Sequence, residues 1–367
     1  MKFVAGLTDR LAQLVVFGRL APEPGSEPYE LPEEARFVAL PDYPSLTALL
    51  ALGRSVRRAR AAFAEELPRL DAVWLFGPHP LSLAFARLAR RRGTPVFLGI
   101  RQDFPRYVAG RLPGRAWLPV LPAAHLLEAA FRRLGRTAPT VAVGEALGLA
   151  YAGGAPVLTT GFSLIRTADL VPLDQALSRS WEGDLRLLWV GRVDPEKNPL
   201  LLPDVLARLR ARDPRWRLTM LGTGSLVGEV ERRAAEVGVA DTLKLAGYVA
   251  NGPDLFARYR ASHALVNVSD TEGLPQVVFE AHAAGIPVVA TDVGGTRAGL
   301  GDGASGLLVP PRDADAVALA LSRVAGDEPL RRRLITAGLE EAARETLDAQ
   351  LDRIVAFFHE NLSRRRG

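Results

Sequence analysis

Short apolar runs alternate with longer stretches of helical period along the second half of the chain. The runs are rich in Leu, Val and Ile, and amphipathic stretches such as 201–212 and 226–238 lie between them. This alternation predicts a parallel β-sheet with helices on both faces. The apolar runs cover residues 185–191, 217–222, 242–247, 264–269, 287–291 and 306–311.

The first half of the chain repeats this pattern less regularly, around an acidic, proline-rich loop at 21–35. Its first residues have the period of a helix instead of the strand and glycine-rich turn that usually open such a domain. We therefore expect an N-terminal domain that lacks its first strand and its glycine loop. The strands expected in this half lie at 14–19, 35–41, 71–77, 94–100, 140–144 and 156–161.

The pattern as a whole predicts an α/β protein of two Rossmann-like domains that face each other across a cleft. At 367 residues the chain is long for a single hydrophobic core. The N-terminal domain is expected at 1–170 and the C-terminal domain at 185–342. Residues 171–184 are the candidate linker between them, and an amphipathic helix is expected within 343–367.

Composition adds limits on where and how the protein works. Apolar residues make up 48% and charged residues 24% of the chain, as in an ordinary globular protein. The absence of cysteine excludes disulfides and thiolate metal sites. The opening MKFVAGLTDR does not have the pattern of a secretory signal. We therefore expect a cytoplasmic protein.

Positive charge is concentrated in residues 51–136, which hold 16 Lys and Arg against 5 Asp and Glu, a net of +11. Two interpretations stay open: an arginine-coated solvated surface, or a surface that attracts anionic lipid head groups or a phosphate-bearing substrate. Nucleic acid is not expected, because no aromatic residues interleave with the charge. The segment 106–136 combines Trp117 and leucines with six arginines. It is interpreted either as a site of peripheral attachment to the inner face of a membrane or as a core-packing helical pair.

Ligands of parallel α/β sheets bind beyond the carboxyl ends of the strands, so the loops that follow the apolar runs are the candidate site. The loop VGRVDPEKNP (190–199) carries Arg192 and Lys197, two cations suited to a diphosphate. Only three of the 46 basic residues are lysines, which makes a lysine in this loop notable. Asn198 before Pro199 suits the start of the following helix.

Glycines also occur at these strand ends. Gly191 follows the first run of the second half, and LGTGSL (221–226) places Gly222 and Gly224 after the second. Such glycines let the backbone approach a ligand closely and leave N–H groups for an anion.

The stretch DTEGLPQVVFEAHAAGIPVV (270–289) holds two carboxylates, Glu272 in a loop and Glu280 in the second turn of an expected helix that starts at Pro275. Glu280 lies among apolar residues, and a buried carboxylate is costly unless it is hydrogen-bonded. A ribose diol is one partner that a carboxylate can hold with two hydrogen bonds. A core carboxylate satisfied within the protein is the alternative.

Taken in order, GRVDPEKNP, LGTGSL, EGLPQVVFE, AHAAGIPVVATDVGG and DGASGLLVPPRDADAVALAL resemble the retaining GT-B glycosyltransferases of family GT4, the glycosyl transferases group 1. The resemblance is strongest over 185–345 and weak in the first half. It implies two facing domains, a final helix that packs back on the N-terminal domain, and a donor site for a nucleotide diphosphate sugar. It also implies no cofactor and no divalent metal.

The resemblance assigns roles to the candidate residues. Arg192 and Lys197 would hold the diphosphate and stabilise the leaving group, and these two residues with Glu272 form the expected catalytic group. Glu280 would bind the ribose, and Glu272 the hydroxyl groups of the sugar. The donor-binding set also includes the backbone or turn positions Gly273, Leu274, Gly191, Gly222 and Gly224.

The N-terminal half departs from the family pattern. Relatives often carry a histidine after the strand at 94–100, where this chain has Arg101. His79, after the preceding strand, is the substitute candidate, and both residues are expected sugar contacts; a structural role for His79 is the alternative. Asp313 and Asp315 spell the D-x-D of metal-dependent transferases, but their place after PPR predicts a helix N-cap.

The expected function is therefore transfer of a sugar from a nucleotide diphosphate sugar to a glycan or lipid-linked acceptor, in cell-envelope or exopolysaccharide synthesis. The alternative is a catalytically silent nucleotide-sugar-binding scaffold of a polysaccharide assembly complex. A nucleotide-sugar epimerase of the same fold is a further alternative within enzymes.

Overall fold

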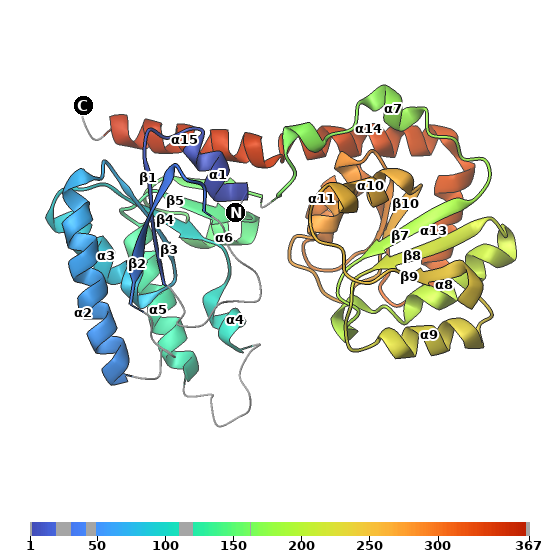
Figure 1. Cartoon of the computed structure of the whole chain (residues 1–367), viewed down its shortest axis with the longest axis horizontal. Helices are drawn as coiled ribbons and strands as arrows, with labels where there is room; N and C mark the ends of the chain where they lie inside the picture. Colours follow the sequence, from blue (N-terminus) through green and yellow to red (C-terminus); the bar gives the residue numbers. More distant parts are fainter. Residues whose placement is uncertain (1, 20–30, 42–48, 110–119, 162, 365–367) are drawn as a thin grey trace. The chain divides into compact units, whose positions relative to one another are not determined.

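The computed structural model describes residues 2–19, 31–41, 49–109, 120–161 and 163–364, and it divides into two compact units. The N-terminal unit comprises Met1–Gly161 and Gln350–Gly367, and the C-terminal unit comprises Phe162–Ala349 (Figure 1). The expected linker 171–184 lies in the C-terminal unit, where α7 (Leu173–Leu177) packs against α14 (Glu328–Arg344).

The C-terminal unit is built on one six-stranded sheet in which every pairing is parallel, so the predicted parallel sheet is confirmed. The strand order is β12-β11-β10-β7-β8-β9. After β7 the chain adds β8 and then β9 on one side of the sheet. After β10 it adds β11 and then β12 on the other side, so the direction in which the chain crosses the sheet reverses between the neighbours β7 and β10. The strands are β7 (Leu185–Val190), β8 (Trp216–Leu221), β9 (Leu243–Leu245), β10 (Ala264–Asn267), β11 (Val288–Thr291) and β12 (Gly306–Val309).

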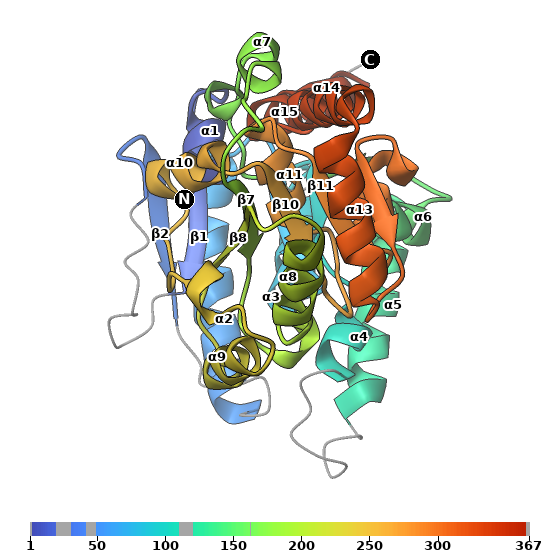
Figure 2. The same cartoon turned by 90° about the vertical axis from the view of Figure 1, so that its right-hand side faces the viewer.

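Helices cover both faces of this sheet, as the alternating pattern predicts. On one face α8 (Leu201–Arg212), α9 (Val227–Glu236) and α13 (Ala314–Gly326) bury apolar side chains against Leu187 and Trp189. On the other face α10 (Pro253–Ala261) and α11 (Gln276–Ala283) pack against Leu188 and Leu265. Figure 2 shows α8 and α13 side by side. The strands are apolar on both sides because both sides are buried.

The N-terminal unit holds two parallel sheets among its described residues. The first described elements are the helix α1 (Lys2–Thr8) and then β1. β1 (Leu14–Arg19) pairs with β2 (Ala35–Leu40), and the second sheet has the order β3-β4-β5-β6. Its strands are β3 (Val73–Gly77), β4 (Val96–Ile100), β5 (Thr140–Val143) and β6 (Val157–Thr160). Its main helices are α2 (Leu49–Glu66), α3 (Pro80–Arg91), α4 (Phe104–Ala109), α5 (Val120–Gly135) and α6 (Glu145–Tyr151).

The last helix, α15 (Leu347–Ser363), begins in the C-terminal unit and continues into the N-terminal one. There it lies beside α1 (Figure 1), where Asp352 forms an ion pair with Arg10 at 2.6 Å. Phe358 packs against Trp74 and Phe97 of the second sheet. Within the ranges that the structure describes, no helix has both the length and the apolar character needed to cross a bilayer.

Candidate active site

The reversal between β7 and β10 creates the position where parallel sheets usually bind ligands. Loops that leave two adjacent strands in opposite directions open a crevice at the carboxyl edge of the sheet. The loop after β7 carries Arg192 and Lys197, and the loop after β10 carries Glu272. Three of the residues singled out in the sequence therefore lie at one edge of one sheet.

Lys197 and Glu272 meet directly across these two loops. The Lys197 Nζ lies 2.7 Å from Glu272 Oε1, and both side chains are largely buried. The same oxygen accepts hydrogen bonds from Ser269 Oγ at 2.7 Å and Asn267 Nδ2 at 3.2 Å. No described residue donates to Glu272 Oε2. Three side chains thus surround one oxygen of this carboxylate, and the Ser269 hydroxyl also lies 2.7 Å from Asn267 Oδ1.

Backbone and side-chain contacts connect the loops of the site. The Asp270 N–H donates to the Glu196 carbonyl at 3.0 Å, which joins the loops after β10 and β7. Arg312, from the loop after β12, forms an ion pair with Asp270 at 2.7 Å. Ser225, after β8, donates from its backbone and its hydroxyl to Asp194 and lowers the pKa of that carboxyl. Loops from four strands therefore hold the site.

Arg192 lies at the exposed rim of the site. Its guanidinium contacts Asp194 at 3.0 Å and also binds Glu196, and 68% of the side chain is exposed. The two carboxylates neutralise this cation in the described structure. A diphosphate would have to compete with them, so the assignment of Arg192 to the diphosphate stays a prediction.

Glu280 is buried in α11, with 8% of the residue exposed. The Tyr259 hydroxyl donates to Oε2 at 2.6 Å, and Asn251 Nδ2 donates to Oε1 at 3.2 Å. Burial, with the nearby Glu280 charge second, raises the pKa of Tyr259 well above its usual value and keeps the hydroxyl proton in place. The protein itself thus supplies hydrogen bonds to the carboxylate, while the assignment of Glu280 to a ribose stays a prediction.

Sequence reasoning did not find Tyr259 or Asn251. Tyr259 lies on the apolar face of α10 and Asn251 in the loop before it, 21 and 29 residues from Glu280. Nothing in their local spacing marks them as partners of a carboxylate. The one usable signal was the buried position of Glu280, which requires hydrogen-bond donors from elsewhere in the fold.

Gly222 and Gly224 bring the loop after β8 against the loop after β7. A Cβ at Gly222 would lie 1.8 Å from the Gly191 carbonyl oxygen, and one at Gly224 would lie 2.4 Å from the Val193 carbonyl oxygen. Gly222 also has φ +143°, which side chains rarely adopt. Packing alone therefore requires glycine at both positions, and a role of these two residues or of Gly191 in binding is untested.

A second glycine pair supports the loop that carries Glu272. A Cβ at Gly294 would lie 1.9 Å from the Glu272 carbonyl oxygen, and one at Gly295 would lie 1.8 Å from the Gly273 carbonyl oxygen. Gly273 itself has open space around its Cβ position, and Leu274 is half-buried under Phe279. The close contacts of Gly294 and Gly295 therefore support the backbone of the loop that contains Gly273 and Leu274.

Two helix starts differ from the sequence prediction. Asn198 is not an N-cap: it closes the short turn Pro195–Lys197 in a left-handed conformation, φ 48°, and α8 begins only at Leu201. Asparagine tolerates this conformation, which lets the chain turn before the helix starts. Pro275 is the N-cap of α11 instead of its first helical residue.

His79 and Arg101 follow the adjacent strands β3 and β4 of the N-terminal unit. His79 caps α3, and its Nδ1 accepts from the Leu81 N–H at 3.2 Å. Burial, and secondarily Arg19, lowers the pKa of His79, which favours the neutral ring that capping needs. Arg101 is exposed. The cap gives His79 a structural role, and a sugar contact for either residue is untested.

The D-x-D pattern folds as the sequence predicts. Asp313 caps α13, because its Oδ1 accepts from the Ala316 N–H at 2.8 Å. Asp315 forms an ion pair with Arg208 at 2.7 Å instead of joining Asp313 at a common point. In the described part of the chain, no group of three or more His, Cys, Asp or Glu side chains could hold a metal ion.

The second half of the chain is similar to known proteins. Residues 175–341 match the family model of the glycosyl transferases group 1. A D-inositol 3-phosphate glycosyltransferase of Stackebrandtia nassauensis is 36% identical over 49% of this chain and 43% of its own length. One from Frankia alni is 39% identical over 47% of this chain and 45% of its length. The chain thus matches less than half the length of these curated relatives.

Solved structures are similar over nearly the whole chain. Sucrose-phosphate synthase from Thermosynechococcus elongatus has a TM-score of 0.68 at 20% identity, covering 99% of this chain and 92% of that one. Trehalose-phosphate synthase from Burkholderia vietnamiensis has a TM-score of 0.65 at 17% identity, covering 98% and 97%. Anabaena HepE in complex with UDP has a TM-score of 0.63 at 18% identity, covering 96% and 100%.

These structural neighbours are GT-B glycosyltransferases, and they share with this chain an α/β architecture of parallel sheets in two domains. Glycosyltransferases of group 1 use nucleotide-sugar donors and no cofactor. The part of the chain that matches the glycosyl transferases group 1 model, residues 175–341, carries Lys197, Glu272 and Glu280.

Proposed function

We propose that the chain is a retaining, metal-independent glycosyltransferase. It moves a sugar from a nucleotide diphosphate sugar to a glycan or lipid-linked acceptor in cell-envelope or exopolysaccharide synthesis. The observation that carries the proposal is the Lys197–Glu272 ion pair at 2.7 Å. The pair lies beyond β7 and β10, where the strand order reverses, in the part of the chain that matches the group 1 model.

In this proposal Lys197 is the movable cation of the site. When the donor binds, the ammonium group of Lys197 moves from Glu272 to the diphosphate. The guanidinium group of Arg192 turns from the rim toward the same diphosphate. As the bond between the sugar and the diphosphate breaks, both cations stabilise the charge that develops on the departing phosphate. The acceptor oxygen bonds to the anomeric carbon, and its proton passes to the leaving phosphate.

Glu272 and Glu280 have separate tasks in the proposal. Glu272 keeps Ser269 and Asn267 as donors when Lys197 leaves, so its free Oε2 stays aimed and accepts from sugar hydroxyl groups. Glu280 is oriented by Tyr259 and binds the ribose. An ionised carboxylate has about four acceptor sites, so Glu280 can keep its protein partners and still accept from a diol. The backbones of Gly273 and Leu274 lie at the sugar or the phosphates.

The proposed class of acceptor is supported by the names of similar proteins. Several carry the name D-inositol 3-phosphate glycosyltransferase, and one from Streptomyces coelicolor, 33% identical over 47% of this chain, is named an exopolysaccharide phosphotransferase. The name of this last relative supports an exopolysaccharide pathway. In the N-terminal unit, Arg101 and His79 would contribute to sugar contact beyond β4 and β3.

We place the protein in the cytoplasm, peripheral to the inner face of the membrane. The described part of 51–136 carries many exposed arginines, among them Arg57, Arg58, Arg60, Arg91 and Arg133. Trp117 lies outside the described residues. Retention on vesicles rich in anionic lipid at low salt, and release at high salt, is the expected behaviour. Passage through such vesicles without retention at low salt would contradict this placement.

A thermal-unfolding panel with UDP, GDP, ADP and their sugar conjugates tests the donor site. A ligand at 100 times its dissociation constant adds about 2.7 kcal/mol to the stability of the folded state. One nucleotide family should raise the midpoint of the wild type and of Glu231→Gln, an exposed carboxylate of α9, but not of Glu280→Gln. No shift with any nucleotide would remove the donor-site assignment.

Nucleotide release separates the enzyme from a silent scaffold. With the sugar conjugate that binds, the wild type should liberate the free nucleotide when an acceptor is supplied, and Lys197→Gln should lose most of that rate. Binding without release, across glycan and lipid-linked acceptors, would instead make the chain a nucleotide-sugar-binding scaffold.

A further inference from the structure

Three residues other than glycine adopt a left-handed backbone conformation in the described part of the chain: Asn198, Asp302 and Arg312. Asparagine and aspartate tolerate this conformation, because their short polar side chains can bond to the local backbone. Arginine has no such compensation, and its Cβ crowds the carbonyl oxygen that follows it. Arg312, with φ 61°, is therefore the most strained of the three.

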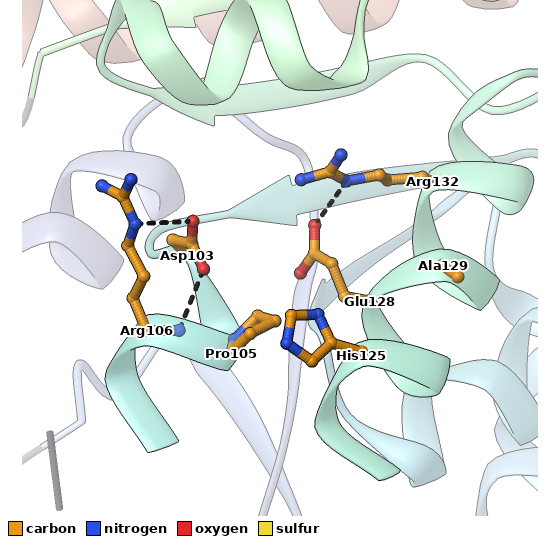
Figure 3. A pocket seen from close by; sticks show the side chains of 7 residues that line it. All are labelled: Asp103, Pro105, Arg106, His125, Glu128, Ala129 and Arg132. Carbon is orange, nitrogen blue, oxygen red and sulfur yellow. Dashed lines mark hydrogen bonds and ion pairs between the residues drawn. The ribbon is translucent and has the colours of Figure 1, made fainter. Parts of the chain in front are cut away.

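Arginines elsewhere in the chain reach carboxylates without this conformation. Arg132 contacts Glu128 one turn earlier in α5, and Arg106 in α4 contacts the preceding Asp103 (Figure 3). Both arginines lie in helices. A pair between an arginine and a carboxylate thus does not in itself require a strained backbone, and the strain at Arg312 needs another explanation.

Arg312 binds Asp270 as a planar fork. Its Nε lies 3.1 Å from Asp270 Oδ1, and its Nη2 lies 2.7 Å from Oδ2. The arginine side chain is 76% exposed, so the pair adds little to the stability of the fold. The strain of a side chain in the left-handed region is at least as large as the contribution of such a pair. Stability therefore does not account for an arginine at this position.

Asp270 connects the fork to the candidate active site. It lies in the loop after β10, two positions before Glu272. Its backbone N–H donates to the Glu196 carbonyl at 3.0 Å, and Glu196 immediately precedes Lys197. Through Asp270, the Arg312 fork thus holds the point at which the loops that carry Glu272 and Lys197 are joined.

We propose that Arg312 is a positioning residue of the donor site. Its fork holds the loop 270–272 in the position that the donor needs, and the site keeps a strained residue for that reason. Without the fork, the donor must order the loop when it binds, which weakens binding. The inference rests on the proposed function, because it takes this loop as part of a nucleotide-sugar site.

Titration calorimetry on the full chain, with UDP, GDP and ADP as probes, tests the inference. For the nucleotide that binds the wild type, Arg312→Gln should raise the dissociation constant about 3- to 10-fold. Arg312→Lys keeps the charge but not the planar fork, so it should restore only part of the affinity.

Arg215→Gln is the matched control. Arg215 forms the same fork with Asp213, with Nε 3.0 Å from Oδ1 and Nη2 2.7 Å from Oδ2. This fork lies at the amino end of β8, whereas the candidate site lies at the carboxyl ends of the strands. The control variant should bind the nucleotide as tightly as the wild type does.

The unfolding midpoint without nucleotide separates positioning from a structural role. Glycine adopts the left-handed conformation without strain. Arg312→Gly should therefore unfold at or above the wild-type midpoint and still bind the nucleotide as weakly as Arg312→Gln does. A residue that only supported the fold would give a lower midpoint when replaced.

A double-mutant cycle tests the path through Asp270. Asp270→Asn, alone or combined with Arg312→Gln, should weaken binding about as much as Arg312→Gln does, because each variant removes the same contact. Wild-type affinity in Arg312→Gln, losses that add in the combination, or a lower midpoint for Arg312→Gly would overturn the inference and leave the donor site in place. Failure of all three nucleotides to bind the wild type would overturn both.

Discussion

Two glutamates eight residues apart are held in different ways. Glu272 shares one oxygen among Lys197, Ser269 and Asn267 and leaves the other open. Glu280 lies inside α11, where Tyr259 donates to one carboxylate oxygen and Asn251 donates to the other. Because Glu280 is buried, the hydrogen bonds from these donors offset the cost of keeping its charge in the interior.

The substitution Tyr259→Phe should destabilise the fold by about 1–3 kcal/mol, because the buried Glu280 loses its closest donor while the volume of the side chain hardly changes. Urea unfolding measures the loss. Tyr248→Phe, with 67% of the tyrosine exposed, removes the same hydroxyl from the surface and should stay within about 0.5 kcal/mol of the wild type. Equal stability of the two variants would mean that Tyr259 does not support the carboxylate.

The buried His282 should make stability fall in mild acid. Burial lowers the pKa of His282 to about 4, below its usual 6.5, and Nε2 donates to the Ser305 carbonyl at 3.1 Å. The unfolded chain therefore takes up a proton below pH 6.5 that the folded chain excludes. The free energy of unfolding should drop by about 1.4 kcal/mol per pH unit from this group, between pH 6.5 and about 4.

Urea unfolding at pH 7.0, 5.5 and 4.5 isolates this contribution, because carboxylates titrate equally in all variants. The His282→Gln variant should lose less stability across this range than the wild type, by about 2.5 kcal/mol. His359→Gln, an exposed histidine of α15, should follow the wild type. Parallel slopes for all three proteins would show that His282 is not the group responsible.

At the scale of elements, backbone packing shapes the site as much as side chains do. The double glycine after β11 touches the backbone of the loop that carries Glu272, and Gly222 and Gly224 touch the loop after β7. Each contact needs a position without a Cβ atom. These contacts fix the loops through their backbones.

The substitution Gly295→Ala should displace the loop 272–274, because its Cβ would lie 1.8 Å from the Gly273 carbonyl oxygen. We expect a loss of about 1–3 kcal/mol in stability and weaker binding of the nucleotide that stabilises the wild type. Urea unfolding and thermal shift measure the two effects.

Gly299→Ala is the matched control, since the nearest atom to its Cβ would be at 3.7 Å, an ordinary contact. This variant should keep wild-type stability within about 0.5 kcal/mol and wild-type binding. If Gly295→Ala behaved in the same way, the loop would not depend on the double glycine.

The sequence predicted most of the helices and strands, for physical reasons. Strands buried on both faces leave continuous apolar runs, so 185–191 and 264–269 marked β7 and β10 to within two residues. The turn at Asn198 was predicted wrongly, because a left-handed residue depends on the contacts of the whole loop. The division of the N-terminal strands into two sheets depends on long-range pairing, which local patterns do not contain.

The candidate site was predictable only in part. Lys197 and Glu272 were found because the ends of adjacent parallel strands share one edge. Tyr259 was not found, since its partner is distant in sequence and an apolar helix face commonly includes tyrosine.

At the scale of the whole molecule, the chain visits the N-terminal unit twice. The segment from Gln350 returns to that unit, and α15 contributes aromatic and charged contacts to it. The ring centroids of Phe358 lie 5.1 Å from Trp74 and 4.5 Å from Phe97. The N-terminal unit is therefore complete only when the last residues of the chain have folded onto it.

The substitution Phe358→Ala should lower the stability of the N-terminal unit alone. Losing the aromatic contacts of this partly buried phenylalanine should lower the free energy of unfolding by about 2 kcal/mol. In a unit of this size, that loss lowers the unfolding midpoint by roughly 4–8 °C. Calorimetry should show two transitions, of which the variant shifts only one. A nucleotide that binds the C-terminal unit, as proposed, should shift only the other. Leu126→Ala, an exposed leucine of the same unit, should change neither transition. A shift of both transitions by Phe358→Ala would mean instead that α15 stabilises the two units jointly.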